Sequence, residues 1–437
     1  MSFELQTVLD LNRDRIIKKK FDQTIRARMQ IIAGRTGSSV QRATVNMVFL
    51  IDSSGSMNEN YYATGQTKRQ VVHDAVKALI GMFDKADTIS IISFNSNAVV
   101  HVDHSPGGNP AVVERALAQY LKDDGGTNFE AAMKMAESVC RRKTGENYKL
   151  IFLTDGNSQS GNNDNALKVC RKLAENGITT DAMGIGSDFD FEYMKKYTDL
   201  SGSKTENITQ SNQVGRLFGD IYTRTSNVFL KKVFINFHFS RIVRDVHFYM
   251  HEPEMKNLHE FIHRDQNGTV VQVNAGDVEQ ESFKEFLFDF AIDTPDSSSI
   301  EIGTALIHFD CPVKQLLNQK LEQVLYLNLA DTEDAEIIDG SINDAYSDIE
   351  ILERQNDILK LVEQKKFKEA AVCLEKMAET AARIGAHDKA KHFREMKNKV
   401  MRENNVTQED LNAIVYTSSR SSVKSRLNSQ QPSEPLV

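Results

Sequence analysis

The chain has 437 residues, of which 40% are hydrophobic and 26% charged, an ordinary composition for a globular protein with a sizeable core. At about 150 residues per domain, this length suggests about three domains. The net charge of −8 comes without a basic block, so we expect no general nucleic-acid binding. The sequence contains no run of about 18 apolar residues, so no transmembrane segment is predicted.

The cysteines and the first residues bear on the compartment. The four cysteines are scattered without C-x-x-C spacing, which is typical of reduced thiols. The opening residues have no basic segment followed by an apolar run, so no secretory signal is predicted. We therefore expect a cytoplasmic protein.

Two segments with alternating hydrophobicity open the chain, at residues 5–11 and 25–32. In the second segment Ile25, Ala27 and Met29 share one face, as in a half-buried strand. Both segments are predicted to be strands, and each needs a partner from elsewhere in the chain.

From residue 44 the pattern changes to continuous apolar runs. The run at residues 47–51 is typical of a strand buried on both faces. Similar runs recur at 89–94, 150–153 and 182–185, and helical stretches occupy 66–83, 110–121, 128–140, 164–176 and 189–200. This alternation predicts an α/β domain over residues 44–226, with a Rossmann-like parallel sheet, right-handed crossovers and flanking helices.

The next region is rich in alternating strands. Residues 233–239 and 286–292 alternate apolar and other side chains, and Asn267-Gly268 is a strong hairpin signal. We expect an antiparallel β-sandwich made of residues 227–330 together with residues 1–43, so that the α/β domain is inserted into the sandwich.

The C-terminal region reads as helical. Two apolar stripes, at residues 367–381 and 390–400, flank a break at Gly385 and predict a helical hairpin within residues 331–410. Packing of this hairpin against the sandwich is favoured over a peptide-binding groove. Residues 411–437, rich towards their end in Ser, Asn, Gln and Pro, are predicted to form a disordered tail.

Polar side chains follow the first buried strand of the α/β region. Asp52, Ser54 and Ser56 alternate directly after it, so their oxygens can converge on one point. Ligands of such sheets bind outside the carboxyl ends of the strands. Hard oxygen donors suit Mg²⁺ or Ca²⁺ better than Zn²⁺. The alternative is a serine-rich loop that only caps the next helix.

Two further loops offer matching oxygens. Thr127 lies in Gly-Gly-Thr-Asn before a predicted helix, and Asp155 lies in Thr-Asp-Gly after a buried strand. Together with the segment Phe49-Leu50-Ile51-Asp52 and the Gly184-Ile185-Gly186 turn, the three loops resemble the metal-ion-dependent adhesion site of the von Willebrand factor A (vWA) domain family. The resemblance covers about 180 residues of the chain.

The resemblance implies a role for each residue. Ser54 and Ser56 are expected to bind the metal directly through their hydroxyls, and Thr127 to bind directly in the ligand-ready state. Asp52 and Asp155 are expected to act through bound waters and hydrogen bonds. Neutral hydroxyls leave much of the charge of Mg²⁺ unquenched, so an open coordination position attracts an Asp or Glu of a partner protein. A purely structural metal is the alternative.

The domain order is also similar to that of relatives of the calcium-activated chloride-channel regulators and the inter-α-trypsin inhibitor heavy chains. This second resemblance rests on a vWA-like domain followed by a sandwich and helices, and on residues 216–233 running directly into a strand. It does not imply an ion channel.

Two short patterns in the sequence resemble those of enzymes. His259, Glu260 and His263 spell H-E-x-x-H, the zinc-protease pattern, which requires an α-helix so that both imidazoles share a face. The segment reads instead as a hairpin arm, where residues four apart lie about 13 Å apart. A phosphatase of the haloacid dehalogenase type needs a second Asp two residues after Asp52, and Ser54 stands there.

The leading hypothesis is a non-enzymatic, cation-dependent protein-binding module. Its metal ligands are Asp52, Ser54, Ser56, Thr127 and Asp155, its cofactor is Mg²⁺ with Ca²⁺ or Mn²⁺ as alternatives, and its partner presents an Asp or Glu. A second hypothesis makes the protein an accessory subunit of an AAA+ ATPase that uses the same site. The third is the zinc hydrolase built on His259, Glu260 and His263.

Overall fold

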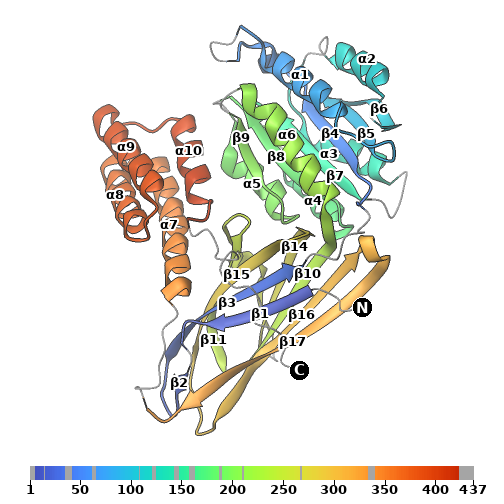
Figure 1. The fold of residues 1–437 in the computed structure, drawn as a ribbon. Coiled ribbons are helices and arrows are strands. Elements are labelled where there is room, and N and C mark those ends of the chain that lie inside the picture. The colour runs from blue at the N-terminus through green and yellow to red at the C-terminus, as the bar shows by residue number, and fades with distance from the viewer. Residues whose placement is uncertain are drawn as a thin grey trace.

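The computed structural model places three groups of elements, an α/β domain, two antiparallel sheets and a set of C-terminal helices (Figure 1). It describes residues 5–13, 15–34, 42–61, 65–107, 109–120, 125–141, 147–156, 163–186, 189–208, 211–265, 268–332 and 340–422. Asn267, part of the predicted hairpin signal, lies outside these residues, and so do residues 423–437 of the predicted tail.

The α/β domain is built on a six-stranded sheet in the order β6-β5-β4-β7-β8-β9. Its strands are β4 (Asn46–Asp52), β5 (Thr88–Phe94), β6 (Ala98–Pro106), β7 (Tyr148–Thr154), β8 (Thr179–Ile185) and β9 (Thr205–Ile208). The four apolar runs form the central strands β5, β4, β7 and β8, which pair in parallel as predicted. The sheet is mixed rather than purely parallel, because β6 pairs antiparallel with β5 at the edge.

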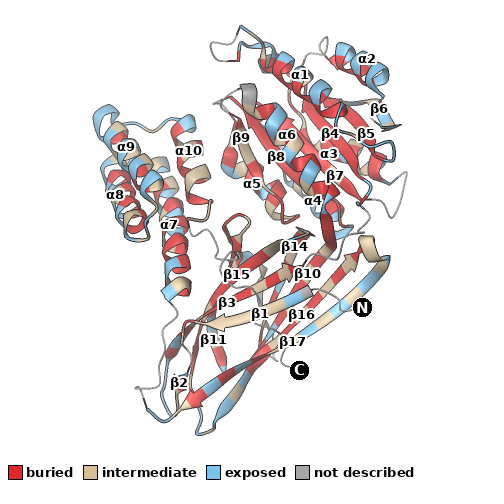
Figure 2. Ribbon diagram, in the orientation of Figure 1, coloured by how far each residue is buried: buried red, intermediate tan, exposed pale blue. Residues whose placement is uncertain are grey.

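Helices cover both faces of this sheet (Figure 2). They are α1 (Lys68–Ile80), α2 (Pro110–Tyr120), α3 (Phe129–Cys140), α4 (Asn163–Glu175), α5 (Phe191–Asp199) and α6 (Ser211–Ser226). Phe49 of β4 packs with α1, α2 and α6 on one face, and Leu50 packs with α3, α4 and α5 on the other. Burial on both faces explains why the strands are continuously apolar.

The strands outside this domain form two sheets. One has the order β1-β3-β15-β11-β12 and the other β13-β14-β10-β16-β17-β2. The bounds are β1 (Leu5–Leu11), β2 (Ile16–Ile17), β3 (Gln23–Ala33), β10 (Val228–Ser240), β11 (Val243–Glu252), β12 (Lys256–Asn257), β13 (Ile262–Asp265), β14 (Gly268–Glu279), β15 (Ser282–Ile292), β16 (Ser299–Cys311) and β17 (Leu316–Ala330).

The N-terminal strands find their partner beyond the α/β domain. β3 pairs antiparallel with β15 along its whole length, with Met29 opposite Phe286. The chain therefore leaves this sheet, forms the α/β domain and returns to the same sheet. A core rich in phenylalanine lies between the two sheets, with Phe237 against Phe248 at a ring-centroid distance of 4.6 Å. Aromatic pairs at such distances add to the burial of apolar area.

Four helices follow the sandwich: α7 (Gly340–Glu363), α8 (Phe367–Arg383), α9 (His387–Glu403) and α10 (Gln408–Ser418). The predicted hairpin corresponds to α8 and α9, whose stripes are buried together. The patterns did not predict α7, because its apolar residues face two neighbours. Ile351 packs with α8 and α9, whereas Ile349 packs on Tyr249 of the sandwich.

Helix α10 corrects the prediction of a disordered tail from residue 411. A capping box begins the helix, in which the Thr407 hydroxyl accepts from the Asp410 backbone N–H and the Asp410 carboxylate accepts from Thr407. The Asn412 amide donates to the Phe189 carbonyl, and Val415 lies in the core of the α/β domain. Tertiary contacts therefore hold a segment whose composition gives little helical signal.

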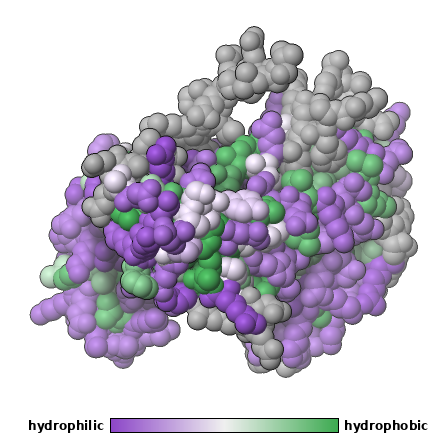
Figure 3. Space-filling model, turned by 90° about the horizontal axis from the view of Figure 1, so that it is seen from below, coloured by the Kyte–Doolittle hydropathy of each residue, from purple (hydrophilic) through white to green (hydrophobic). Residues whose placement is uncertain are grey.

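No helix among the described residues is long and apolar enough to cross a membrane. The face of the molecule seen from the sandwich end is mostly hydrophilic, with scattered hydrophobic patches (Figure 3). Such scattered patches are normal for protein surfaces.

A buried histidine joins the sandwich to the helices. Nδ1 of His251 lies 2.7 Å from Glu285 Oε1, and Nε2 lies 3.5 Å from Asp348 Oδ2 of α7. Asp348 also accepts from the Ser422 backbone N–H at 2.7 Å and from Lys389 Nζ at 3.3 Å. Burial favours the neutral imidazole, but the two carboxylates outweigh it and raise the pKa of His251 to about 9.

We predict that this contact stabilises the fold in a defined pH window. A group whose folded pKa is raised contributes its full stability below its unfolded pKa, about 6.5, and loses it as the pH rises through the folded value. The free energy of unfolding of wild type, measured with a chemical denaturant, should therefore fall by on the order of 3 kcal/mol between pH 6.5 and 9. His251→Gln should be less stable at pH 6 and nearly indifferent to this change. Equal pH responses of the two proteins would contradict the assignment.

Candidate metal centre

Three loops meet at the carboxyl edge of the α/β sheet, and each holds predicted site residues. Asp52 ends β4, Asp155 follows the last residue of β7, and Thr127 directly precedes Asn128, the residue that caps α3. Parallel strands bring their carboxyl ends to one edge, so residues distant in sequence become neighbours there.

Hydrogen bonds link four of the five predicted residues. The Ser54 backbone N–H donates to Asp52 Oδ1 at 2.8 Å, the hydroxyls of Ser54 and Ser56 lie 3.1 Å apart, and Ser56 Oγ donates to Asp155 Oδ1 at 2.9 Å. Thr154, which was not predicted, donates its hydroxyl to Asp52 Oδ2 at 2.6 Å. The first and third loops therefore form one connected polar cluster.

Thr127 belongs to a loop that is held against this cluster by the backbone. The Gly55 N–H donates to the Gly125 carbonyl at 3.1 Å. Gly125 has a φ of 147°, and a Cβ there would press against the Asn95 side chain at 3.2 Å, which explains a glycine at this position. Thr127 itself is buried, with 6% of its surface exposed.

The site contains two carboxylates that are both buried. Asp52 is fully buried and Asp155 is 1% exposed. Burial, with a smaller contribution from the nearby Asp155, raises the pKa of Asp52 to about 6, although the hydrogen bonds from Thr154 and Ser54 lower it. A buried carboxylate is stable in its charged form only when cations or donors compensate it.

Lys68 supplies one such positive charge, and sequence reasoning missed it. Its ammonium lies 2.7 Å from Asp155 Oδ2 and 2.9 Å from Glu59 Oε2, and its side chain is 7% exposed. A capping box between Thr67 and Gln70 begins α1 immediately before Lys68 and so directs this side chain to the site. No spacing relative to Asp52 signals this role, because it depends on where the helix begins.

Arg69 is a second residue that the sequence did not reveal. Its buried guanidinium donates to the carbonyls of Ser53 at 3.0 Å, Ser54 at 3.3 Å and Tyr120 at 3.0 Å. The Tyr120 hydroxyl in turn donates to the Asp52 carbonyl at 2.9 Å. These bonds occupy the carbonyls of the first loop and fix its backbone, leaving its hydroxyls and carboxylates to form the site.

The donor set fits a hard divalent cation. It consists of two carboxylates and three hydroxyls, all oxygen ligands of the kind that Mg²⁺, Mn²⁺ and Ca²⁺ prefer. Among the residues that the structure describes, no three or more histidine, cysteine, aspartate or glutamate side chains form a group that could hold a metal ion, so the candidate site depends on its hydroxyls as well.

The H-E-x-x-H segment does not form an α-helix. His259 and Glu260 lie in a short 3₁₀ turn, His259–Phe261, and His263 lies on β13, which pairs antiparallel with β14. The predicted hairpin arm is therefore present from Ile262, preceded by a turn that was not predicted. The geometry that two zinc-binding histidines four residues apart require is missing.

Comparison with known proteins identifies a similar domain around the candidate metal site. Residues 47–157, which carry all five predicted ligands, match the von Willebrand factor type A domain. The α/β part of the chain has the vWA fold, and we refer to it below as the vWA domain. The vWA domain is a general module for protein interaction and adhesion.

Relatives match parts of the chain at low identity. An uncharacterized protein from Synechocystis sp. is 22% identical over 290 residues, 66% of each chain. Inter-alpha-trypsin inhibitor heavy chain H4 from Sus scrofa is 24% identical over 197 residues, 43% of this chain and 21% of that one. The predicted resemblance to these heavy chains is confirmed for this part of the chain, which spans only about a fifth of their length.

Two solved structures share the fold across nearly the whole chain. A von Willebrand factor type A protein from Catenulispora acidiphila covers 95% of this chain with 15% identity and a TM-score of 0.77. The ArnB paralog VWA2 from Sulfolobus acidocaldarius covers 96% with 15% identity and a TM-score of 0.60. The combination of vWA domain, antiparallel sheets and C-terminal helices is therefore a recurring architecture.

We predict that Lys68 lowers the affinity of the site for a divalent cation, because its ammonium already neutralises Asp155. Lys68→Met should raise the affinity for Mg²⁺ about tenfold, or about 1.4 kcal/mol. Isothermal titration of MgCl₂ into wild type and variant measures the change. Lys77→Met, an exposed lysine of the same helix paired with Glu114, is the control and should match wild type. Weaker binding by the Lys68 variant would show that the ammonium orients Asp155 instead.

Proposed function

We propose that the vWA domain holds one Mg²⁺ and uses it to bind a carboxylate of a partner protein. Ser54, Ser56 and Thr127 supply hydroxyls to the ion, and Asp52 and Asp155 hold its waters and balance its charge. The observation that carries the proposal is the connected chain Ser54–Ser56–Asp155, with contacts of 3.1 Å and 2.9 Å, beside a second buried carboxylate.

The balance of charge supports the cation. Lys68 is bonded to Asp155, whereas the donors to Asp52 among the described residues are neutral, the Thr154 hydroxyl and the Ser54 backbone N–H. A divalent cation beside Asp52 would compensate its buried charge. Both Ser54 and Ser56 hydroxyls can turn their lone pairs to such an ion by giving up their mutual hydrogen bond.

The same arrangement supports a carboxylate ligand. Mg²⁺ takes six oxygens in octahedral geometry, and the loops supply few of them, so waters or an incoming group must complete the shell. Ser56 is only partly buried and Glu59, beside it, is exposed, so the outer side of the site faces solvent. An aspartate or glutamate side chain is the protein group best suited to replace a water there.

The other hypotheses gain less support. No contact in the described residues favours an accessory role beside an AAA+ ATPase, and the 3₁₀ turn at His259 removes the helix that zinc hydrolysis needs. Relatives of this domain are mostly non-enzymatic binding modules. The cytoplasmic location stays a prediction.

The metal is tested first. Saturating Mg²⁺ should raise the melting temperature of the full chain, because a ligand at a hundred times its Kd stabilises the folded state by about 2.7 kcal/mol. Asp52→Asn should abolish the rise and Thr127→Ala should reduce it. Thr223→Ala, an exposed threonine on α6, should behave as wild type. A melting curve unchanged by Mg²⁺, Mn²⁺ and Ca²⁺ would overturn the proposal.

The carboxylate is tested next, by capture of partners from a lysate with immobilised protein. Proteins held in Mg²⁺ should be released by EDTA and should not bind the Thr127→Ala variant. In an identified partner, replacement of one Asp or Glu by the amide should remove binding, because a neutral amide is a poorer ligand for a hard dication. Retention in EDTA would mean that the metal has a structural role only.

A further inference from the structure

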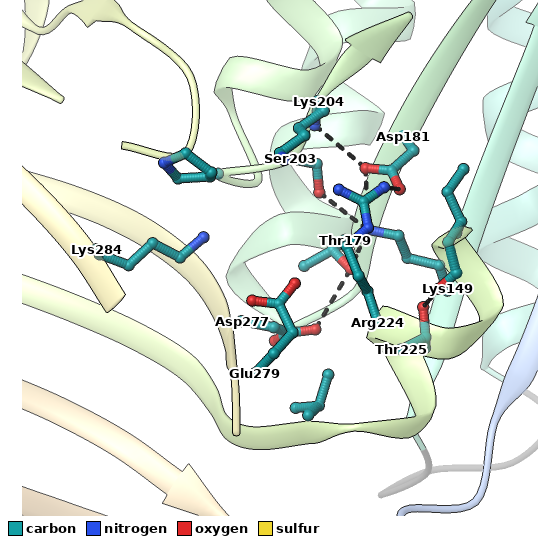
Figure 4. A pocket seen from close by; sticks show the side chains of 14 residues that line it. Lys149, Thr179, Asp181, Ser203, Lys204, Arg224, Thr225, Asp277, Glu279 and Lys284 are labelled. Atoms are coloured by element: carbon teal, nitrogen blue, oxygen red, sulfur yellow. Dashed lines mark hydrogen bonds and ion pairs between the residues drawn. The ribbon is translucent and has the colours of Figure 1, made fainter. Parts of the chain in front are cut away.

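A second polar cavity lies away from the metal centre, between the vWA domain and the sandwich (Figure 4). Lys149 of β7, Asp181 of β8 and Arg224 of α6 line it from one side, and Asp277 of β14 and Lys284 of β15 from the other. It leaves about 40 Å³ for the centres of water-sized molecules. That is room for a few waters or one small ion.

Lys284 is the unusual member of this lining. It occupies the same face of β15 as Phe286, Phe288 and Phe290, the row that fills the sandwich core. The residue is 3% exposed, and its ammonium points into the cavity (Figure 4). Among the described residues no side chain or carbonyl makes a hydrogen bond or ion pair with this ammonium. Burial lowers the pKa of Lys284 to about 8.

The neighbouring cations are only partly compensated. Asp181 is shared by two of them, Lys149 at 3.1 Å and Arg224 at 3.7 Å. Burial lowers the pKa of Lys204, and Arg224 lowers it further. In the described part of the chain no carboxylate forms an ion pair with the ammonium of Lys204, which is partly buried, or of Lys284, which is buried.

The acidic side chains that line the cavity do not balance its positive charge. Four basic residues, Lys149, Lys204, Arg224 and Lys284, face three acidic ones, Asp181, Asp277 and Glu279. Asp277 Oδ2 accepts from the Thr179 hydroxyl at 3.4 Å, and its buried Oδ1 has no partner. Burial raises the pKa of Asp277, against the nearby charges of Lys231 and Lys149.

We propose that this cavity binds one small tetrahedral oxyanion, phosphate or sulfate. Lys284 would contact it from the sandwich, and Arg224 and Lys204 from the vWA domain. The Ser203 hydroxyl accepts from Lys149 at 3.2 Å and keeps its own hydrogen for the ligand. An anion bonded from both sides ties the two domains together. The small volume excludes a nucleotide.

The cavity and the metal centre take opposite ligands. The metal centre combines two buried carboxylates with hydroxyls, whereas this cavity combines an unpaired buried ammonium with further cations. Neither site depends on the other for its residues, so the anion proposal stands independently of the proposed function.

The test is isothermal titration of sodium phosphate and sodium sulfate into the full chain, with sodium chloride at matched ionic strength. Wild type should bind one phosphate or sulfate and melt several degrees higher with it. Lys284→Met should bind at least tenfold more weakly. Without phosphate this variant should melt at or above the wild-type temperature, because the desolvated charge is gone.

Two further variants separate the proposal from a loss of folding. Lys320→Met, an exposed lysine on β17, should keep the wild-type response, and Lys284→Arg should keep most of it. If chloride stabilises wild type as much as phosphate does, or if Lys284→Met responds fully, the cavity holds only water and the proposal is wrong.

Discussion

The meeting of two buried carboxylates at the end of a parallel sheet is the constraint on which the rest of the site depends. Asp52 and Asp155 come from neighbouring strands and are almost fully buried, so each needs a compensating charge or donor. The Lys68 ammonium compensates Asp155, and hydroxyl and backbone donors form hydrogen bonds with Asp52. Arg69 fixes the loop backbone so that this arrangement persists. This arrangement is the basis for the proposed cation site.

Buried charged and polar side chains also join the three parts of the molecule. His251 connects the sandwich to α7 through Glu285 and Asp348, and Lys284 reaches from the sandwich towards the vWA domain. Asn412 holds α10 on the vWA domain. Apolar packing, such as that of Ile349 on Tyr249, accompanies these polar contacts, so only part of the strength of the junctions depends on pH.

The sequence predicted what depends on local pattern. Buried runs located β4, β5, β7 and β8, and residues adjoining strand ends located Asp52, Ser54, Ser56 and Asp155, because the carboxyl edge brings them together in any such sheet. It missed Lys68 and Arg69, whose roles depend on where α1 begins and how it lies. It also missed α7, whose apolar residues serve two neighbours, and α10, which tertiary bonds hold. It also missed β6, an edge strand that runs antiparallel to β5 after a short turn at residues 95–97.

The central claim is that the Ser54 and Ser56 hydroxyls, with Thr127, hold a divalent cation. The most direct measurement is the anomalous scattering of Mn²⁺ soaked into crystals of the full chain, since Mn²⁺ shares the oxygen preference of Mg²⁺. The account predicts one peak about 2.0 to 2.3 Å from both serine hydroxyls, with Asp52 and Asp155 around it. An anomalous map with no peak at these serines, at saturating Mn²⁺, would contradict it.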